Sequence, residues 1–196
     1  MDNGKNKRRA KKIIVYGIVQ GVGFRPLVYH IAKKHGLTGN VKNVGGFVEI
    51  ILNATENELE EFIRDMKDNT SGESEIIRID IEDIAASKTE AIDDFTIIES
   101  EGADRISIIP PDLPVCPDCQ RELYDESDRR FFNPFISCMS CGPRYTIIEE
   151  LPYDRDNTTM KDFEMCGECR EEYASPESRR FHAQTISCNN CGPYLI

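Results

Sequence analysis

Apolar and polar residues follow two different periodicities along the first part of the chain. "KKIIVYGIVQ" (11–20) is a run of β-branched and apolar residues, which predicts a strand. "RPLVYHIAKKHG" (25–36) instead spaces its apolar residues as one face of a helix does. Pro26 suits a first helical turn, and Gly36 suits a helix end. The pattern therefore predicts a strand that leads almost directly into a helix.

The same alternation continues after this helix. "LTGNVKN" (37–43) and "GFVEIIL" (46–52) predict two strands joined by a glycine turn. Thr55 and Glu58 have the spacing of a capping box, which predicts the start of a second helix. Four apolar residues share one face of that helix: Leu59, Phe62, Ile63 and Met66.

Two further strands complete the first hundred residues. In "EIIRIDIED" (75–83), Ile77, Ile79 and Ile81 alternate with charged residues, which predicts a half-buried strand. "DFTIIES" (94–100) predicts a last short strand. The order βαββαβ plus a final strand predicts an α+β domain of the ferredoxin-like type.

The glycine-rich stretch "GIVQGVGFR" (17–25) joins the first strand to the first helix. Gly21 and Gly23 permit a positive φ and a close approach of the backbone to a ligand. Backbone N–H groups at such a helix start form an anion site, and Arg25 adds a planar charged fork suited to phosphate. The glycine spacing fits neither the dinucleotide fingerprint nor a Walker loop. From these residues alone, an alternative interpretation is equally possible: the stretch is a tight turn, and its arginine pairs with a surface carboxylate.

All eight cysteines occur at or after Cys116, and they fall into two copies of C-x2-C-x18-C-x2-C. Two residues between cysteines let both sulfurs of a knuckle face one metal ion, so each copy supplies four ligands for tetrahedral zinc. Disulfides and redox dithiols are the alternatives. The expected ligands of two structural zinc ions are, for the first, Cys116, Cys119, Cys138 and Cys141, and for the second, Cys166, Cys169, Cys188 and Cys191.

The two cysteine copies are near-duplicates that lie fifty residues apart. The residues of the first copy that recur in the second include Cys116, Cys119, Arg129, Arg130, Phe131, Ile136, Ser137, Cys138, Cys141, Gly142 and Pro143. We expect the repeated "RRF" to pack its finger or to dock another domain. His182 lies in the second copy where the first has Phe132, so we do not expect it to be a zinc ligand.

Charge and composition limit the classes of partner. The 196 residues carry a net charge of −11, and no apolar run approaches the roughly 18 residues that cross a membrane. The first twelve residues are basic and lack the apolar core of a signal peptide. We favour a solvated tail over a nucleic-acid arm, because the remaining acidic chain and two ZnCys4 sites repel phosphates. We expect a cytoplasmic, reducing location, with neither nucleic acid nor membrane as a partner.

The glycine loop and a second motif, "GNVKNVGGFVE" (39–49), together resemble acylphosphatases over residues 11–100. The resemblance implies that the phosphoryl group of an acyl phosphate is bound by the loop Gln20, Gly21, Val22, Gly23, Phe24 and Arg25. It implies that Asn43 positions the attacking water, with Arg25 and Asn43 as the catalytic residues and no metal at this site. Asn40 stands where small acylphosphatases often carry an aromatic residue, which is a change either in the substrate pocket or on the surface.

The whole arrangement, with "RRFHAQTISC" and "CGP" in the second copy, resembles the N-terminal part of the HypF carbamoyltransferases of nickel–iron hydrogenase maturation. This resemblance implies that carbamoyl phosphate is the substrate. It implies that ATP with Mg²⁺ acts only in downstream domains missing from this sequence, and that the protein HypE accepts the carbamoyl group. We therefore expect the chain to be a truncated protein, an expressed fragment or the product of a split gene. A general acylphosphatase with a zinc scaffold and a non-catalytic zinc adaptor are the alternatives.

The expected organisation follows from these patterns. It consists of a basic disordered tail (1–10), an acylphosphatase-like domain (11–100), a proline-containing linker (101–115), a first zinc finger (116–143), a connector (144–165) and a second zinc finger (166–196).

Overall fold

The computed structural model describes residues 7–70, 74–89, 91–102 and 108–194. The chain divides into two compact units. One comprises residues 1–20 and 24–108, and the other comprises residues 109–196 together with Gly21–Gly23. Among the described residues, no helix combines the length and apolar character needed to cross a bilayer.

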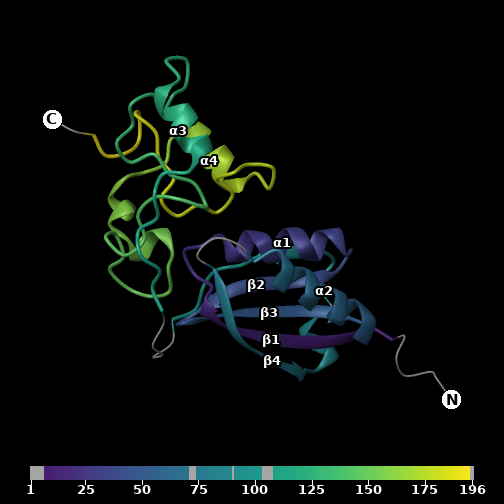
Figure 1. Cartoon of the computed structure of the whole chain (residues 1–196). Helices are drawn as coiled ribbons and strands as arrows, with labels where there is room; N and C mark the ends of the chain where they lie inside the picture. The colour runs from purple at the N-terminus through teal and green to yellow at the C-terminus, as the bar shows by residue number, and fades with distance from the viewer. Residues whose placement is uncertain (1–6, 71–73, 90, 103–107, 195–196) are drawn as a thin grey trace. The chain divides into compact units, whose positions relative to one another are not determined.

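The first unit is a five-stranded sheet with two helices, α1 (Phe24–Lys34) and α2 (Glu56–Asp68) (Figure 1). The strands are β1 (Arg9–Ile18), β2 (Thr38–Val44), β3 (Phe47–Ala54), β4 (Glu75–Asp83) and β5 (Phe95–Ile97). Their order across the sheet is β4-β1-β3-β2-β5, with β5 parallel to β2 and every other pair antiparallel. A short 3₁₀ helix, η1 (Ala86–Lys88), lies between β4 and β5. The predicted α+β order of elements is confirmed.

The core of this unit lies between the helices and one face of the sheet. Alternate residues of β1 and β3 point to that face, so Ile13, Val15, Val48 and Ile50 are fully buried. The helices contribute buried residues to the same core: Val28, Ile31 and Ala32 from α1, and Leu59, Phe62 and Met66 from α2. Alternation on the strands and helical spacing on the helices therefore fill one layer of apolar side chains.

The predicted capping box is present at the start of α2. The Thr55 hydroxyl accepts a hydrogen bond from the Glu58 amide at 3.3 Å, and the Glu58 carboxylate accepts one from the Thr55 amide at 2.8 Å. Arg8 also donates to this carboxylate, at 2.6 Å. The box therefore satisfies two backbone donors that the first turn of a helix leaves without partners.

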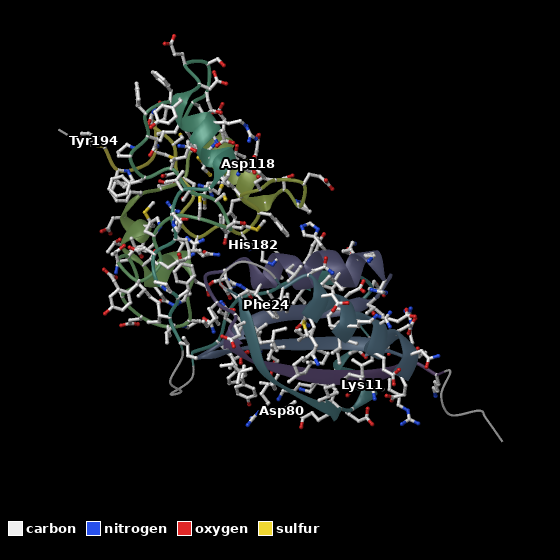
Figure 2. The ribbon with its side chains drawn as sticks, in the orientation of Figure 1. Lys11, Phe24, Asp80, Asp118, His182 and Tyr194 are labelled. Atoms are coloured by element: carbon white, nitrogen blue, oxygen red, sulfur yellow. The ribbon has the colours of Figure 1, made fainter. Side chains whose placement is uncertain are left out.

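Two expectations need correction. Ile77 and Ile81 do not lie in a buried row, because β4 is an edge strand and their exposed fractions are 62% and 46%. A β-bulge between Tyr16 and Gly17 shifts the register, so that Arg78 pairs with Tyr16 while Ile76 pairs with Gly17. Figure 2 labels Asp80 on this exposed strand.

The second correction concerns the start of β1. This strand begins at Arg9, inside the segment expected to be a tail (1–10); residues 1–6 lie outside the described residues.

The second unit contains little regular structure. Two helices, α3 (Pro117–Tyr124) and α4 (Gly167–Ala174), each begin directly after the first cysteine of a copy. Asp118, labelled in Figure 2, lies in the first turn of α3. Two short 3₁₀ helices, η2 (Arg155–Asn157) and η3 (Thr159–Asp162), occupy the connector. Each copy has its own small apolar core built around its cysteines.

The first prediction concerns the pH dependence of the α2 cap. The hydrogen bond from Arg8 lowers the pKa of Glu58, and the Thr55 donors lower this pKa further, against the effect of burial. The ionised Glu58 carboxylate therefore stabilises the folded state fully above its unfolded pKa of about 4.3. This stabilisation is lost as the pH falls through the lower pKa that Glu58 has in the folded state. We expect Glu58→Gln to remove this pH dependence, whereas Thr55→Ala should lower the free energy of unfolding by about 1 kcal/mol at neutral pH. Hydrogen exchange of the α2 amides between pH 3 and 7 measures both effects. An unchanged pH profile in Glu58→Gln would contradict this account.

Candidate active site and cysteine clusters

The loop between β1 and α1 has the backbone conformation that its glycines permit. Gly21 has φ of +71° and Gly23 has φ of +74°, both in the left-handed region that favours glycine. The chain then enters α1 at Phe24, labelled in Figure 2. The first turn of α1 holds no acidic residue, so the partial positive charge at the helix start is not offset there. This loop has the elements of an anion site.

Gln20 fixes the start of this loop to the turn between β2 and β3. Its side-chain amide donates to the Gly45 carbonyl at 2.8 Å and to the Phe47 carbonyl at 3.2 Å. The side chain is buried, with 3% of its surface exposed. Because only Val44 separates Asn43 from the β2–β3 turn, this contact couples the position of the loop to that of the strand end that carries Asn43.

Arg25 and Asn43, predicted from two separate motifs, contact consecutive residues. Arg25 lies in the first turn of α1, where its Nη1 donates to Ser100 Oγ at 3.1 Å. Asn43 lies near the end of β2, where its carbonyl accepts from the amide of Glu101 at 2.9 Å. Both residues are buried, with exposed fractions of 9% and 1%. The segment after β5 therefore holds the two residues in one region of the first unit.

Ser100 is a member of this region that the sequence motifs did not reveal. It lies outside both motifs, at the end of the stretch "DFTIIES". A parallel bridge between Val44 and Glu101 continues the β2–β5 pairing and brings Ser100 to Arg25. The only earlier signal was the prediction of a last strand ending at residue 100.

Lys42 and its partners neutralise charge on the other face of β2. Successive strand residues point to opposite faces, so Lys42 and Asn43 point away from each other. The Lys42 ammonium lies 2.6 Å from the Glu101 carboxylate and 3.4 Å from that of Glu49. Burial lowers the pKa of Lys42, but the hydrogen bond to Glu101 and the charge of Glu49 outweigh burial and raise it. Lys42 is therefore fully charged at neutral pH and is held on the opposite side from Asn43.

The eight cysteines form the two expected clusters of four. Within each cluster, the ligand atoms all lie within 4.8 Å of one another. Measured sulfur–sulfur distances are 3.8 Å for Cys116–Cys138 and 3.7 Å for Cys138–Cys141, and they range from 3.6 to 3.8 Å in the second cluster. A tetrahedron with Zn–S bonds of about 2.3 Å has edges of about 3.8 Å, so the spacing fits structural zinc. It is much longer than a disulfide bond of about 2.05 Å, and all eight cysteines are free.

Hydrogen bonds between the thiols favour the ionised form of some sulfurs and the neutral form of their partners: those to Cys138 and Cys141 raise the pKa of Cys119, and burial raises that of Cys169. The hydrogen bond from Cys119 and then that from Cys138 lower the pKa of Cys141 to about 3, against the effect of burial. Burial raises the pKa of Cys166, but hydrogen bonds from the Cys169 amide and from neighbouring thiols outweigh it and lower this pKa to about 7. Metal ions bind the thiolate form of cysteine, so this chemistry fits the donor set of a zinc finger.

The glycine after each second knuckle is required by close packing. A Cβ atom on Gly142 would lie 2.5 Å from the Cβ of Ser137, and one on Gly192 would lie 2.6 Å from the Cβ of Ser187. Gly142 also has φ of +94°. Both glycines therefore allow the backbone of the second knuckle to approach the residue that precedes it.

His182 lies outside the second cluster, which consists of four cysteines. Its ring packs on Tyr173 with centroids 4.9 Å apart, and on Phe181 with centroids 4.7 Å apart. Its φ is +53°, and Phe132 at the matching position of the first copy has φ of +51°. The shared feature of these two positions is therefore a backbone turn.

Comparisons with known proteins agree with this division. Residues 11–97 match the Acylphosphatase family, and residues 115–148 and 165–196 each match the HypF finger. An acylphosphatase of Staphylococcus haemolyticus is 35% identical over 80 residues, which are 41% of this chain and 90% of that protein. The fold and the cysteine clusters thus define an acylphosphatase domain joined to a duplicated four-cysteine finger.

Relatives that match more than two thirds of the chain are named carbamoyltransferase HypF. A probable carbamoyltransferase HypF of Methanocaldococcus jannaschii is 51% identical over 136 residues, which are 68% of this chain and 18% of that protein. A crystal structure of full-length HypF in a phosphate- and nucleotide-bound form has a TM-score of 0.89 and 44% identity, over 96% of this chain and 25% of that one. The chain thus combines an acylphosphatase domain with two HypF fingers, and it spans about a fifth of the length of the curated HypF carbamoyltransferases that it matches.

Proposed function

We propose that the first unit hydrolyses an acyl phosphate, with carbamoyl phosphate as the substrate. The observation that carries this proposal is the placement of Arg25 and Asn43 against consecutive residues, Ser100 and Glu101, beside a glycine loop at a helix start. A binding group for phosphate and a side chain able to orient water thereby share one region. Relatives named carbamoyltransferase support carbamoyl phosphate over other acyl phosphates.

The phosphoryl group is bound by the loop Gln20, Gly21, Val22, Gly23, Phe24 and Arg25. Its backbone N–H groups and the Arg25 guanidinium are aimed at the phosphate oxygens, where negative charge increases in the transition state. Ser100 Oγ accepts from Arg25 Nη1, and this contact holds the guanidinium in a fixed orientation. The donors assigned to this step are N–H groups, which hold an anion and do not ligate a metal ion.

Asn43 positions the attacking water. Its side chain is neutral and too weak a base to take a proton, so a phosphate oxygen of the substrate accepts the proton as the water attacks phosphorus. The P–O bond to the carbamoyl group breaks at the same time, and carbamate leaves with the bonding electrons. Carbamate is a good leaving group, so positioning and electrostatic stabilisation supply most of the rate enhancement.

In the complete reaction sequence, this hydrolysis supplies carbamate for an ATP-dependent step. We propose that ATP with Mg²⁺ acts in parts of the protein beyond these residues, and that HypE receives the carbamoyl group for the cyanide ligands of nickel–iron hydrogenase. The HypF relatives, of which this chain covers about a fifth, support that assignment. A cytoplasmic location and a lack of nucleic-acid partners remain part of the proposal.

We also propose that each cysteine cluster holds one structural zinc ion. The sulfur spacing of a ZnCys4 tetrahedron supports this assignment. When bound, the metal cross-links two knuckles that are otherwise held by a small apolar core. A general acylphosphatase with a zinc scaffold remains the second candidate, since relatives named acylphosphatase match the first unit alone.

The second prediction concerns the two catalytic side chains. We expect Arg25→Ala and Asn43→Ala each to lower acyl phosphate hydrolysis on the order of 10²- to 10³-fold, because each removes a preorganised group. Phosphate should still protect the Asn43 variant against heat, since the anion loop remains, and should protect the Arg25 variant much less. Release of inorganic phosphate and thermal melting with phosphate measure these effects.

Matched controls for this experiment are Arg64→Ala on exposed α2 and Asn53→Ala on β3, both expected to retain activity. Equal protection by phosphate in the Arg25 and Asn43 variants would contradict the assigned roles. Full activity of both variants would show that hydrolysis does not use these side chains, and no hydrolysis by the unaltered chain would favour a non-catalytic adaptor.

The third prediction concerns the metal. We expect two zinc ions per chain after purification under reducing conditions, and one per chain for Cys138→Ser in excess zinc. The first unit should remain folded in this variant, because no cysteine precedes Cys116. Elemental analysis and circular dichroism measure both outcomes. Zinc near zero in the unaltered chain, with disulfides found by mass spectrometry, would refute the assignment.

The fourth prediction separates the two candidate substrates. We expect kcat/KM to be higher for carbamoyl phosphate than for acetyl phosphate. The Arg25→Ala variant, assayed in parallel, corrects for spontaneous decomposition of each compound. Equal values, or a preference for acetyl phosphate, would support the general acylphosphatase instead.

A further inference from the structure

The two cysteine copies exchange arginine side chains. Arg129 of the first copy extends its Nη1 to 3.3 Å from Cys169 Sγ and 3.7 Å from Cys166 Sγ. In the opposite direction, Arg179 of the second copy extends its Nη1 to 3.7 Å from Cys119 Sγ and 3.9 Å from Cys116 Sγ. The two residues are fifty positions apart, so the repeat in sequence is also a reciprocal contact in space.

The next arginine of each copy makes a second reciprocal contact. Arg130 donates from Nε to the Ser187 carbonyl at 2.8 Å, and its Nη2 lies 3.7 Å from Cys169 Sγ. Arg180 donates from Nε to the Ser137 carbonyl at 2.9 Å, and its Nη2 lies 3.8 Å from Cys119 Sγ. Each guanidinium therefore contacts a sulfur of the first knuckle and the backbone just before the second knuckle of the other copy.

One carboxylate beside each cluster forms ion pairs with both arginines of the other copy. Glu172 on α4 is paired with Arg129 at 2.8 Å and with Arg130 at 2.5 Å. Glu122 on α3 is paired with Arg179 at 2.5 Å and also with Arg180. These carboxylates lie three residues after Cys169 and Cys119, on the helix that each first knuckle begins.

The charges of this arrangement compensate one another. Four thiolates around Zn²⁺ carry a formal charge of about −2, which is unfavourable in a buried site. Arg130 and Arg180 are almost fully buried, with exposed fractions of 2% and 3%, and they would be equally unfavourable without acceptors. N–H donors aimed at sulfur reduce the charge on the ligands and fix their orientation, as outer partners of metal ligands generally do.

We propose that the arginine pair of each copy is the outer shell of the other copy's metal site, so that the two sites bind metal cooperatively. The link runs through local structure. The Phe132 amide donates to the Leu123 carbonyl on α3, and the His182 amide donates to the Tyr173 carbonyl on α4. Each arginine pair is thus held by the helix that its own first knuckle begins. Metal at one cluster orders the arginines that the other cluster needs.

This inference rests on the proposed metal, and metal release from the full chain tests it with a readout other than activity. Zinc is withdrawn with a chelator, and alkylation with mass spectrometry shows which four cysteines become reactive. Arg129→Gln/Arg130→Gln should weaken metal binding at the Cys166 cluster by about 10- to 100-fold. Arg179→Gln/Arg180→Gln should do the same at the Cys116 cluster. Cys138→Ser/Cys141→Ser should speed release from the Cys166 cluster as well.

Exposed arginines on the same two helices provide the matched controls. Arg121→Gln on α3 and Arg170→Gln on α4 should release metal at the unaltered rate. If the Arg129/Arg130 variant loses metal first from its own Cys116 cluster, or if the clusters empty independently, the proposal is wrong. A chain that binds no metal would overturn both this inference and the metal assignment. A chain that binds two ions with unaltered release in the variants would overturn this inference alone.

Cadmium-113 NMR separates a positioning role from a loss of folding. The cadmium-loaded chain should give two resonances, one from each cluster. Arg129→Lys, which keeps the charge but loses the planar fork, should move the resonance of the Cys166 cluster and leave the other in place. Arg179→Lys should do the reverse. Movement of both resonances, or of neither, would contradict direct outer-shell contacts.

Discussion

A buried guanidinium needs acceptors for its five N–H donors, and much of this chain is arranged around that requirement. In the second unit, buried arginines bind sulfur atoms, carboxylates and backbone carbonyls. Arg155 of the connector, which is half-buried, also donates to the carbonyls of Gln184, Ile186 and Phe163 at 2.6 to 2.9 Å. Burial lowers the pKa of Arg155 and outweighs the opposite effect of negative groups such as Cys191, while the three carbonyls accept its N–H donors. A unit with little regular structure is thus organised by charge pairing as much as by apolar burial.

The first unit uses a buried guanidinium differently. Its core is an apolar layer between the sheet and the helices, and Arg25 lies in the first turn of α1. The Ser100 hydroxyl is a weak, neutral partner for a full positive charge. An anion such as phosphate is a stronger partner, because charge-assisted hydrogen bonds are about twice as strong as neutral ones. In the proposed function, the same residue type therefore provides ligand affinity in the first unit, whereas it provides stability in the second.

The sequence predicted the elements of the first unit well, because apolar periodicity, a capping box and glycine turns all indicated the same fold. It also predicted which cysteines form each cluster, since that depends on local spacing. It did not predict the exposure of Ile77, which is the extra residue of a bulge in the edge strand β4, between the paired residues Ile76 and Arg78. The contact of Ser100 with Arg25 depends on the path of a segment after the last strand, which no local pattern specifies.

The destination of the arginine pairs was also beyond sequence reasoning. The repeated "RRF" showed that both copies need these residues, and a pair could serve its own copy or the other. Both alternatives satisfy the same spacing, so only the three-dimensional structure separates them.

The reciprocal contacts also explain why the finger occurs twice. A single copy would present Arg129 and Arg130 without Glu172 and Cys169, and would leave Glu122 and Cys119 without Arg179 and Arg180. With the proposed metal bound, each copy alone would have two arginines without acceptors and a negatively charged cluster without arginine donors. The second copy supplies the missing partners of both. Duplication here is therefore a condition for burying the charge of either site.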